Sequence, residues 1–84
     1  MPKAKPLPSA REVVARNLRL IRRAKSLSQE NVALEAGISR PYVSSVERSA
    51  INASLDQLEM IAKAVGVPLH DLTNPKLFPD LDGS

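Results

Sequence analysis

The chain has 84 residues, no cysteine and a formal net charge of +3. This length allows one domain with a small core, and the absence of cysteine excludes disulfides, thiolate metal ligands and thiol nucleophiles. No run of about 18 apolar residues predicts a membrane span, and the segment MPKAKPLPSA lacks the apolar stretch of a secretory signal. We therefore expect a cytoplasmic protein without a membrane partner, stabilised by a partner subunit.

Positive charge is concentrated at the start of the chain. Residues 1–25 contain eight of the twelve Lys and Arg residues and one acid, whereas residues 26–84 have a net charge of −4. A polyanion would meet the first of these segments. A solvated basic helix face explains the same charges equally well, so charge alone leaves both interpretations open.

The first helix is predicted to start near Ala10, because Ser9 and Glu12 form a capping-box pair after a proline-containing segment. A rotation of about 100° per residue places one apolar stripe on this helix. Its members are Val14, Leu18 and Ile21. Arg22 lies at the edge of that stripe.

Two short helices are predicted next. Ser28 caps a helix over 29–36, and Gly37 ends it in the left-handed conformation that glycine adopts without strain. Ser39 caps the following helix, whose first turn tolerates Pro41. Because only about three residues connect the two, we expect their axes to cross steeply.

Two further helices complete the prediction. Ser54 and Gln57 form a capping box that opens a helix ending at Gly66, and Pro68 starts a short last helix that reaches Leu72. No segment alternates as a strand would. The sequence therefore predicts an all-α fold of five helices.

The residues from Gln29 onward have a characteristic spacing of small and apolar side chains. They are Val32, Ala33, Gly37, Ile38, Val43 and Val46. The pattern resembles the helix-turn-helix of the Cro/phage-repressor (Xre) family over most of the chain. The resemblance implies a lambda-repressor-like DNA-binding domain at 9–74, between a flexible basic arm at 1–8 and an irregular tail at 75–84. The stretch SRPYVSSVERSAIN is similar to the short controller proteins of restriction–modification systems.

The outer face of the third helix is predicted to read bases. Its side chains are short and polar, which lets the helix axis approach the floor of the major groove, and Arg40 has the reach and the fork for guanine. We expect base contacts from Arg40, Pro41, Ser44 and Ser45. An ordinary solvated helix face is the alternative, although it would favour Glu and Lys over serine.

Other polar residues are expected to contact phosphates. Gln29 matches the family position that binds a phosphate at a helix N-terminus, although a plain first-turn polar residue is the alternative. The full set is Gln29, Ser39, Tyr42, Arg48 and Asn52. The chain departs from the family in the loop before the fourth helix, where Ser49 replaces the usual glycine and Ala53 the usual proline.

Glu47 falls on the inward face of the third helix, where an unpaired carboxylate is costly. Arg22 is the available cation, and the family resemblance implies the same pairing between the first and third helices. We expect this pair to be structural. His70 is the only histidine and has no second ligand at metal spacing, and no base neighbours Ser44 or Ser45. We therefore expect no metal site, no enzymatic activity, no cofactor and no small-molecule ligand.

Several apolar residues are left over once the inward-facing positions of the helices are assigned. The family resemblance places a dimer contact near the last helix. The expected interface contains Ile51, Leu69, Leu72 and Phe78. Alternatively, the tail folds back over its own core.

The combined prediction is a sequence-specific double-stranded DNA-binding regulator, a repressor or autoregulator, that binds a palindromic operator as a homodimer. An antitoxin-like or adaptor module on the same fold is the alternative. Glu30 and Glu35 are either a contact for RNA polymerase or plain solvated charge.

Overall fold

The computed structural model describes residues 8–77, in which every regular element is an α-helix. The helices are α1 (Ala10–Ala24), α2 (Gln29–Ala36), α3 (Arg40–Glu47), α4 (Leu55–Val65) and α5 (Leu69–Thr73). The predicted all-α fold of five helices is confirmed. The last helix starts one residue later than predicted, because Pro68 is its N-cap.

Capping residues set the ends of these helices. Ser9 Oγ accepts a hydrogen bond from the Glu12 amide at 3.2 Å, and Glu12 Oε1 accepts one from the Ser9 amide at 3.1 Å. This reciprocal pairing satisfies two backbone donors that the first turn of α1 leaves unpaired. The C-terminal ends of α2 and α4 are closed by Gly37 and Gly66, whose φ angles of 72° and 78° are left-handed.

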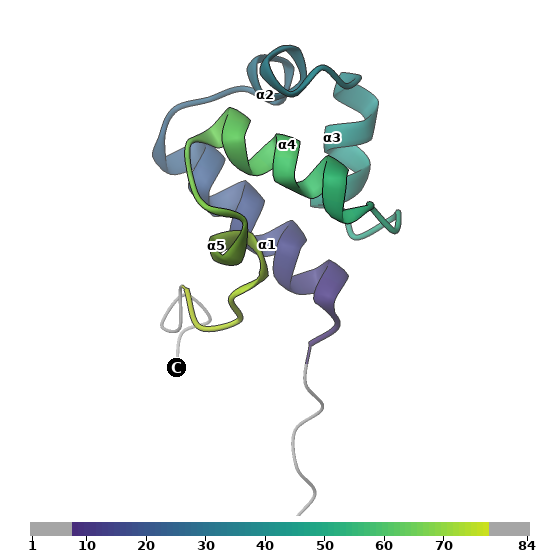
Figure 1. Ribbon diagram of the computed structural model, residues 1–84, viewed down its shortest axis with the longest axis vertical. Helices are drawn as coiled ribbons and strands as arrows, with labels where there is room; N and C mark the ends of the chain where they lie inside the picture. Colours follow the sequence, from purple (N-terminus) through teal and green to yellow (C-terminus); the bar gives the residue numbers. More distant parts are fainter. Residues whose placement is uncertain (1–7, 78–84) are drawn as a thin grey trace, which may run out of the picture.

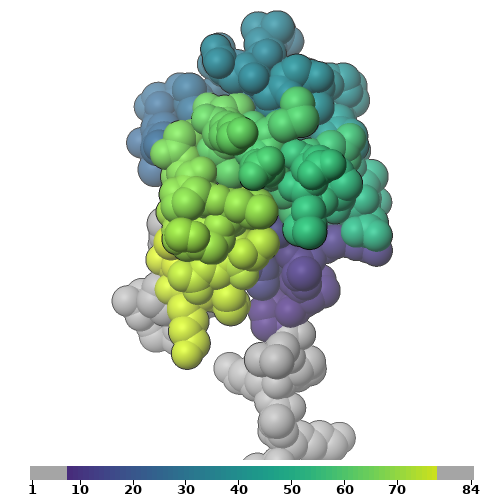
Figure 2. All heavy atoms as spheres, viewed as in Figure 1, coloured from purple at the N-terminus to yellow at the C-terminus, as the bar shows by residue number. Residues whose placement is uncertain are grey.

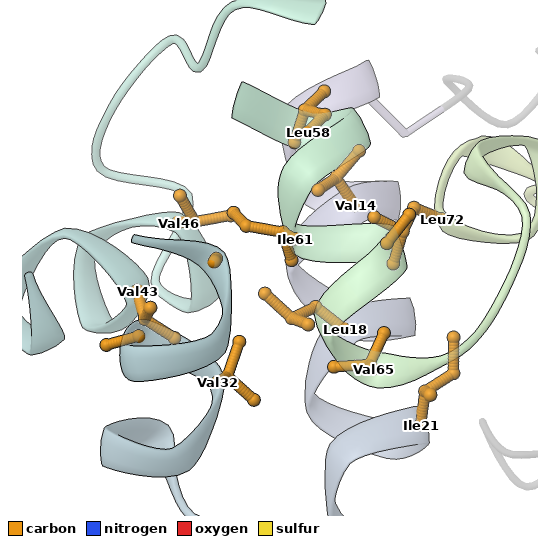
Figure 3. Packing of buried hydrophobic residues seen from close by; sticks show 13 residues of the cluster. Val14, Leu18, Ile21, Val32, Val43, Val46, Leu58, Ile61, Val65 and Leu72 are labelled. Carbon is orange, nitrogen blue, oxygen red and sulfur yellow. The ribbon is translucent and has the colours of Figure 1, made fainter. Parts of the chain in front are cut away.

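Each of the five helices contributes a fully buried aliphatic side chain to one core (Figure 3). These residues are Leu18, Val32, Val43, Ile61 and Leu72. α2 packs against α3 and α4, while α1 packs against α3 and α5. α1 and α4 thus form the scaffold against which α2 and α3 are held (Figure 1).

Leu72 was expected at the centre of a dimer interface, and this expectation is wrong. Its exposed fraction is 0%, because α5 turns the side chain into the monomer's own core. A side chain that is already removed from water has no apolar surface left to bury against a partner. Leu72 therefore stabilises the single domain.

Asn17 is a buried polar residue of α1 that the sequence analysis did not single out. Its exposed fraction is 2%, and its Nδ2 donates to the carbonyl oxygens of Asp71 at 3.0 Å, Leu72 at 3.1 Å and Asn74 at 2.8 Å. These carbonyls lie at the C-terminal end of α5, where the helix has no partners of its own. A side chain of α1 thus caps the last helix.

We expect Asn17→Asp to destabilise the domain by at least about 1–3 kcal/mol, because a carboxylate would face three carbonyl oxygens without donating to them. Asn31→Asp is the matched control. Asn31 accepts hydrogen bonds from Ser28 at the N-terminus of α2, where a carboxylate keeps the cap and suits the helix dipole. Urea unfolding measures both, and equal midpoints for the two variants would contradict the role assigned to Asn17.

Candidate nucleic-acid interface

The turn between α2 and α3 fixes the orientation of α3. Gly37 ends α2, and the Ser39 hydroxyl accepts a hydrogen bond from the Tyr42 amide at 3.2 Å, which starts α3 after a short connection. Val43 and Val46 then enter the core with exposed fractions of 0% and 4%. Because α3 is anchored along this inner face, its opposite face is held in one orientation toward solvent (Figure 1).

The outer face of α3 is short and polar between two arginines. Arg40 and Pro41 are exposed at its start, Ser44 and Ser45 are half-buried in the middle, and Arg48 is exposed at its end. The Arg48 guanidinium folds back, with Nε donating to the Ser44 carbonyl at 3.3 Å and Nη2 to Ser45 Oγ at 3.4 Å. The structure thus brings the expected base-contacting residues onto one surface with a cation at each end.

Glu47 lies beneath this surface with 3% of its side chain exposed. Its carboxylate accepts hydrogen bonds from Arg22 Nε at 2.6 Å, Arg22 Nη2 at 3.0 Å and Gln29 Nε2 at 3.1 Å. The structure therefore brings Arg22 and Glu47 together as a bidentate pair, the strong form of a charge-assisted hydrogen bond. The pair joins α1 to α3.

Hydrogen bonding to the Glu47 carboxylate raises the pKa of the Arg22 guanidinium, against the opposing effect of burial. Arg22 Nη1 also donates to the Leu27 carbonyl at 2.9 Å, in the segment between α1 and α2. One guanidinium thus fixes both the end of α3 and the start of the helix-turn-helix. Such a group stays charged at any pH at which the domain is folded.

Two more cations, Arg19 of α1 and its C-cap residue Lys25, donate to the ends of other helices. Arg19 donates from Nη1 to the Glu47 carbonyl oxygen, and Lys25 Nζ donates to the Val65 carbonyl at 2.7 Å. Both carbonyls are at helix C-termini, where a positive charge satisfies orphan acceptors and complements the helix dipole. Part of the positive charge in the N-terminal segment therefore stabilises the fold. A count of charges could not distinguish these residues from cations that face DNA.

Gln29, the first residue of α2, contacts Arg40 on the outer face of α3. Its Oε1 accepts a hydrogen bond from Arg40 Nη1 at 3.3 Å while its Nε2 donates to Glu47. The exposed Arg40 is thus connected through Gln29 to the buried ion pair. The sequence pattern placed Gln29 at a helix N-terminus and did not indicate these side-chain contacts.

Tyr42 and Asn52 occupy different environments. Tyr42 is half-buried against the core, its hydroxyl donates to Gln57 Oε1, and burial raises the pKa of its phenol, so the hydroxyl remains a donor. This contact ties α3 to the capping box of α4. Asn52 is exposed in the loop before α4. Ser49 in the same loop has a φ angle of 59°, a left-handed conformation that costs a non-glycine residue energy.

The remaining expected residues are placed as follows. Ile51 and Leu69 are half-buried, and Phe78 lies outside the described residues. Within residues 8–77, no group of three His, Asp or Glu side chains is arranged to hold a metal ion. No helix in that part of the chain has the length and apolar character needed to cross a membrane.

We expect Arg22→Ala and Glu47→Ala each to destabilise the domain by about 3–5 kcal/mol, because each leaves a buried charge unpaired. The control is the exposed His70–Asp71 contact, in which the His70 side chain is 80% exposed. There, His70→Ala should change stability by about 0.5 kcal/mol or less. Denaturant unfolding measures all three, and equal effects of His70→Ala and Arg22→Ala would refute a buried, structural pair.

Ser49→Gly should raise stability by about 0.5–1 kcal/mol, because glycine adopts the left-handed conformation without the Cβ clash. Ser44→Gly, the same substitution inside α3, should lower it by about 0.5 kcal/mol. Thermal unfolding of both variants checks the pair. A loss of stability in Ser49→Gly would mean that the Ser49 side chain contributes more than its backbone strain costs.

Comparison with known proteins supports this geometry. A family model described as "Helix-turn-helix" matches residues 18–72. The chain is 45% identical over 65 residues to a hypothetical transcription factor of Neisseria meningitidis, an alignment that covers 77% of this chain and 61% of the relative's length. It is 44% identical over 63 residues to control protein C.BamHI of Bacillus amyloliquefaciens, covering 74% of this chain and 78% of the relative.

Among solved structures, the restriction–modification controller protein C.AhdI of Aeromonas hydrophila superimposes with a TM-score of 0.71 at 37% identity. That match covers 74% of this chain and 94% of C.AhdI. The relatives are transcription regulators, and such proteins are typically not enzymes. The chain therefore belongs to the Cro/phage-repressor (Xre) type of helix-turn-helix proteins, the family of DNA-binding transcription regulators that includes the restriction–modification controller proteins.

Proposed function

We propose that this chain is a sequence-specific regulator of transcription, a repressor or autoregulator, that binds a palindromic operator in double-stranded DNA as a homodimer. The observation that carries the proposal is the outer face of α3, whose short polar side chains lie between Arg40 and Arg48 over a buried ion pair. Such a face lets a helix enter the major groove, and its rigid support limits the orientations in which it can do so.

The proposed contacts divide into two classes. Arg40, Pro41, Ser44 and Ser45 face the base edges, with Arg40 donating to guanine O6 and N7. The backbone contacts come from the other expected polar residues, namely Gln29, Ser39, Tyr42, Arg48 and Asn52. Because the Gln29 amide also holds Arg40, it links the two classes of contact.

A role like that of the controller proteins among its relatives is the specific form that we favour, with action in the cytoplasm on the DNA there. Selection of bound sequences from a random double-stranded pool tests the proposal and reports half-site symmetry. Affinity for the selected site should fall steeply with salt, because bound phosphates release counterions. Salt-insensitive capture of a protein, without any selected sequence, would support the adaptor alternative instead.

A contact with RNA polymerase is a second proposal, favoured by the outer face of α2. Leu34 is 75% exposed there, and Glu30 and Glu35 on the same helix are also exposed. An exposed leucine among acids suits a protein surface that is apolar with a basic rim. Transcription in vitro from a promoter carrying the selected operator tests it: Leu34→Asn should lower any activation and leave operator affinity unchanged.

We expect Arg40→Ala to weaken binding to the selected operator by about 1–3 kcal/mol and to relax the base preference at one position per half-site. Arg48→Ala removes the same charge and should weaken binding to all sequences by a similar factor, with a shallower salt dependence. Gln29→Ala should also weaken all sequences. Competition binding against randomised operators measures these profiles, and identical profiles for the two arginine variants would contradict the assigned roles.

A further inference from the structure

Met60 is the one sulfur-containing residue among residues 8–77. The chain has no cysteine, and its other methionine is Met1, outside the described residues. Met60 lies on α4 with 42% of its surface exposed, so a dissolved oxidant can reach its sulfur. Because thiols are absent, the thioether of Met60 is the group in this part of the chain that a peroxide oxidises most readily.

The methyl group of Met60 lies over the turn that joins α2 to α3. A β-carbon placed on Gly37 would be 3.9 Å from Met60 Cε, which is van der Waals contact. α2 and α4 pack against each other, and Figure 2 shows the green surface of α4 directly against the blue and teal surface of α2 and the start of α3. Met60 thus covers the glycine that ends α2.

The turn beneath this methyl group determines where α3 starts. The Gly37 amide donates to the Leu34 carbonyl at 3.3 Å, and the Ile38 amide donates to the Ala33 carbonyl at 3.0 Å. These bonds close the C-terminal end of α2 around the left-handed glycine. Because the Ile38 side chain packs against the core directly before α3, displacement of the turn would shift the start of the proposed recognition helix.

Oxidation would reverse the polarity of the contact between Met60 and the turn. The thioether sulfur attacks one oxygen of a peroxide, an S–O bond forms and the O–O bond breaks. The sulfur is oxidised to a sulfoxide, and hydrogen peroxide is reduced to water. The new oxygen would lie near the C-terminal end of α2, where carbonyl oxygens carry partial negative charge and the last turn contains no basic residue. Electrostatic repulsion and the loss of apolar packing would both move the side chain away from Gly37.

We propose that Met60 is a site of reversible oxidation by peroxides, at which the sulfoxide loosens the turn between α2 and α3 and lowers affinity for the operator. The functional readout of this inference rests on the proposed operator binding. Met60 acts as a positioning residue, because it contacts the turn and is not on the outer face of α3. Enzymatic reduction of the sulfoxide restores the apolar side chain.

Treatment of the full chain with hydrogen peroxide, followed by removal of the peroxide and binding to the selected operator, tests this site. The oxidised parent should bind about three- to tenfold more weakly, a loss typical of one disturbed packing contact. Met60→Leu keeps an apolar side chain over the turn but has no sulfur, so peroxide should leave its affinity unchanged. Met1 is present in both proteins and gives a common background. The two classes of methionine sulfoxide reductase, added together, should restore binding by the oxidised parent.

A methionine moved to another exposed position is the matched control. In the double variant with Met60→Leu and Leu34→Met, the thioether stands on α2 at a position that is 75% exposed. Peptide mass spectrometry should show the gain of one oxygen atom there, while operator affinity stays constant. Met60→Gln, which places a polar acceptor over the turn without peroxide, should reproduce the loss of affinity.

Three results would each overturn the inference. They are a Met60 side chain that gains no oxygen, an oxidised parent that binds as tightly as the reduced one, and an equal loss of affinity in treated Met60→Leu. Hydrogen exchange at the Gly37 and Ile38 amides separates the site from the proposed function. Faster exchange in the oxidised parent, with no duplex selected, would support the site and refute the proposed function. Unchanged exchange and unchanged operator binding would refute the site alone.

Discussion

The pair between Arg22 and Glu47 is the interaction on which the arrangement of this domain depends. A carboxylate with 3% exposure is tolerated only because two guanidinium nitrogens and one amide nitrogen donate to it. Such a pair contributes little net stability relative to apolar packing, but removing one partner is costly. The pair therefore acts as a constraint on geometry: α3 is stable in the orientation that places Glu47 beside α1, and its polar face is presented to solvent as a consequence.

α1 extends the same principle to the rest of the fold. Arg19 donates to the end of α3, Lys25 to the end of α4, and Asn17 to the end of α5. Three helices thus end on polar side chains of α1 or of its C-cap residue. Because helix C-termini carry unpaired carbonyls and partial negative charge, cations and amide donors are the groups that suit them. In a domain with a small aliphatic core, these directed bonds add specificity that apolar packing alone does not supply.

The segment from α3 to α4 connects the proposed DNA-binding surface to the rest of the core. Tyr42 ties α3 to the capping box of α4 through Gln57, and Val46 packs into the core. A duplex bound at α3 would therefore restrain the loop that joins these helices, in which Ser49 holds a left-handed conformation.

The sequence by itself determined the helices and the polar character of the outer face of α3, because those features depend on local signals. Ser9, Ser28, Ser39 and Ser54 each cap a helix as their spacing predicts, and the inward position of Glu47 on α3 was sufficient to require a cation. Only the tertiary structure decided what depends on contacts between distant segments. Asn17 was not singled out from the sequence, because the partners that explain its burial are more than 50 residues away. Leu72 looked available to a partner until the packing of α5 buried it, since periodicity shows which face is apolar and not what covers that face.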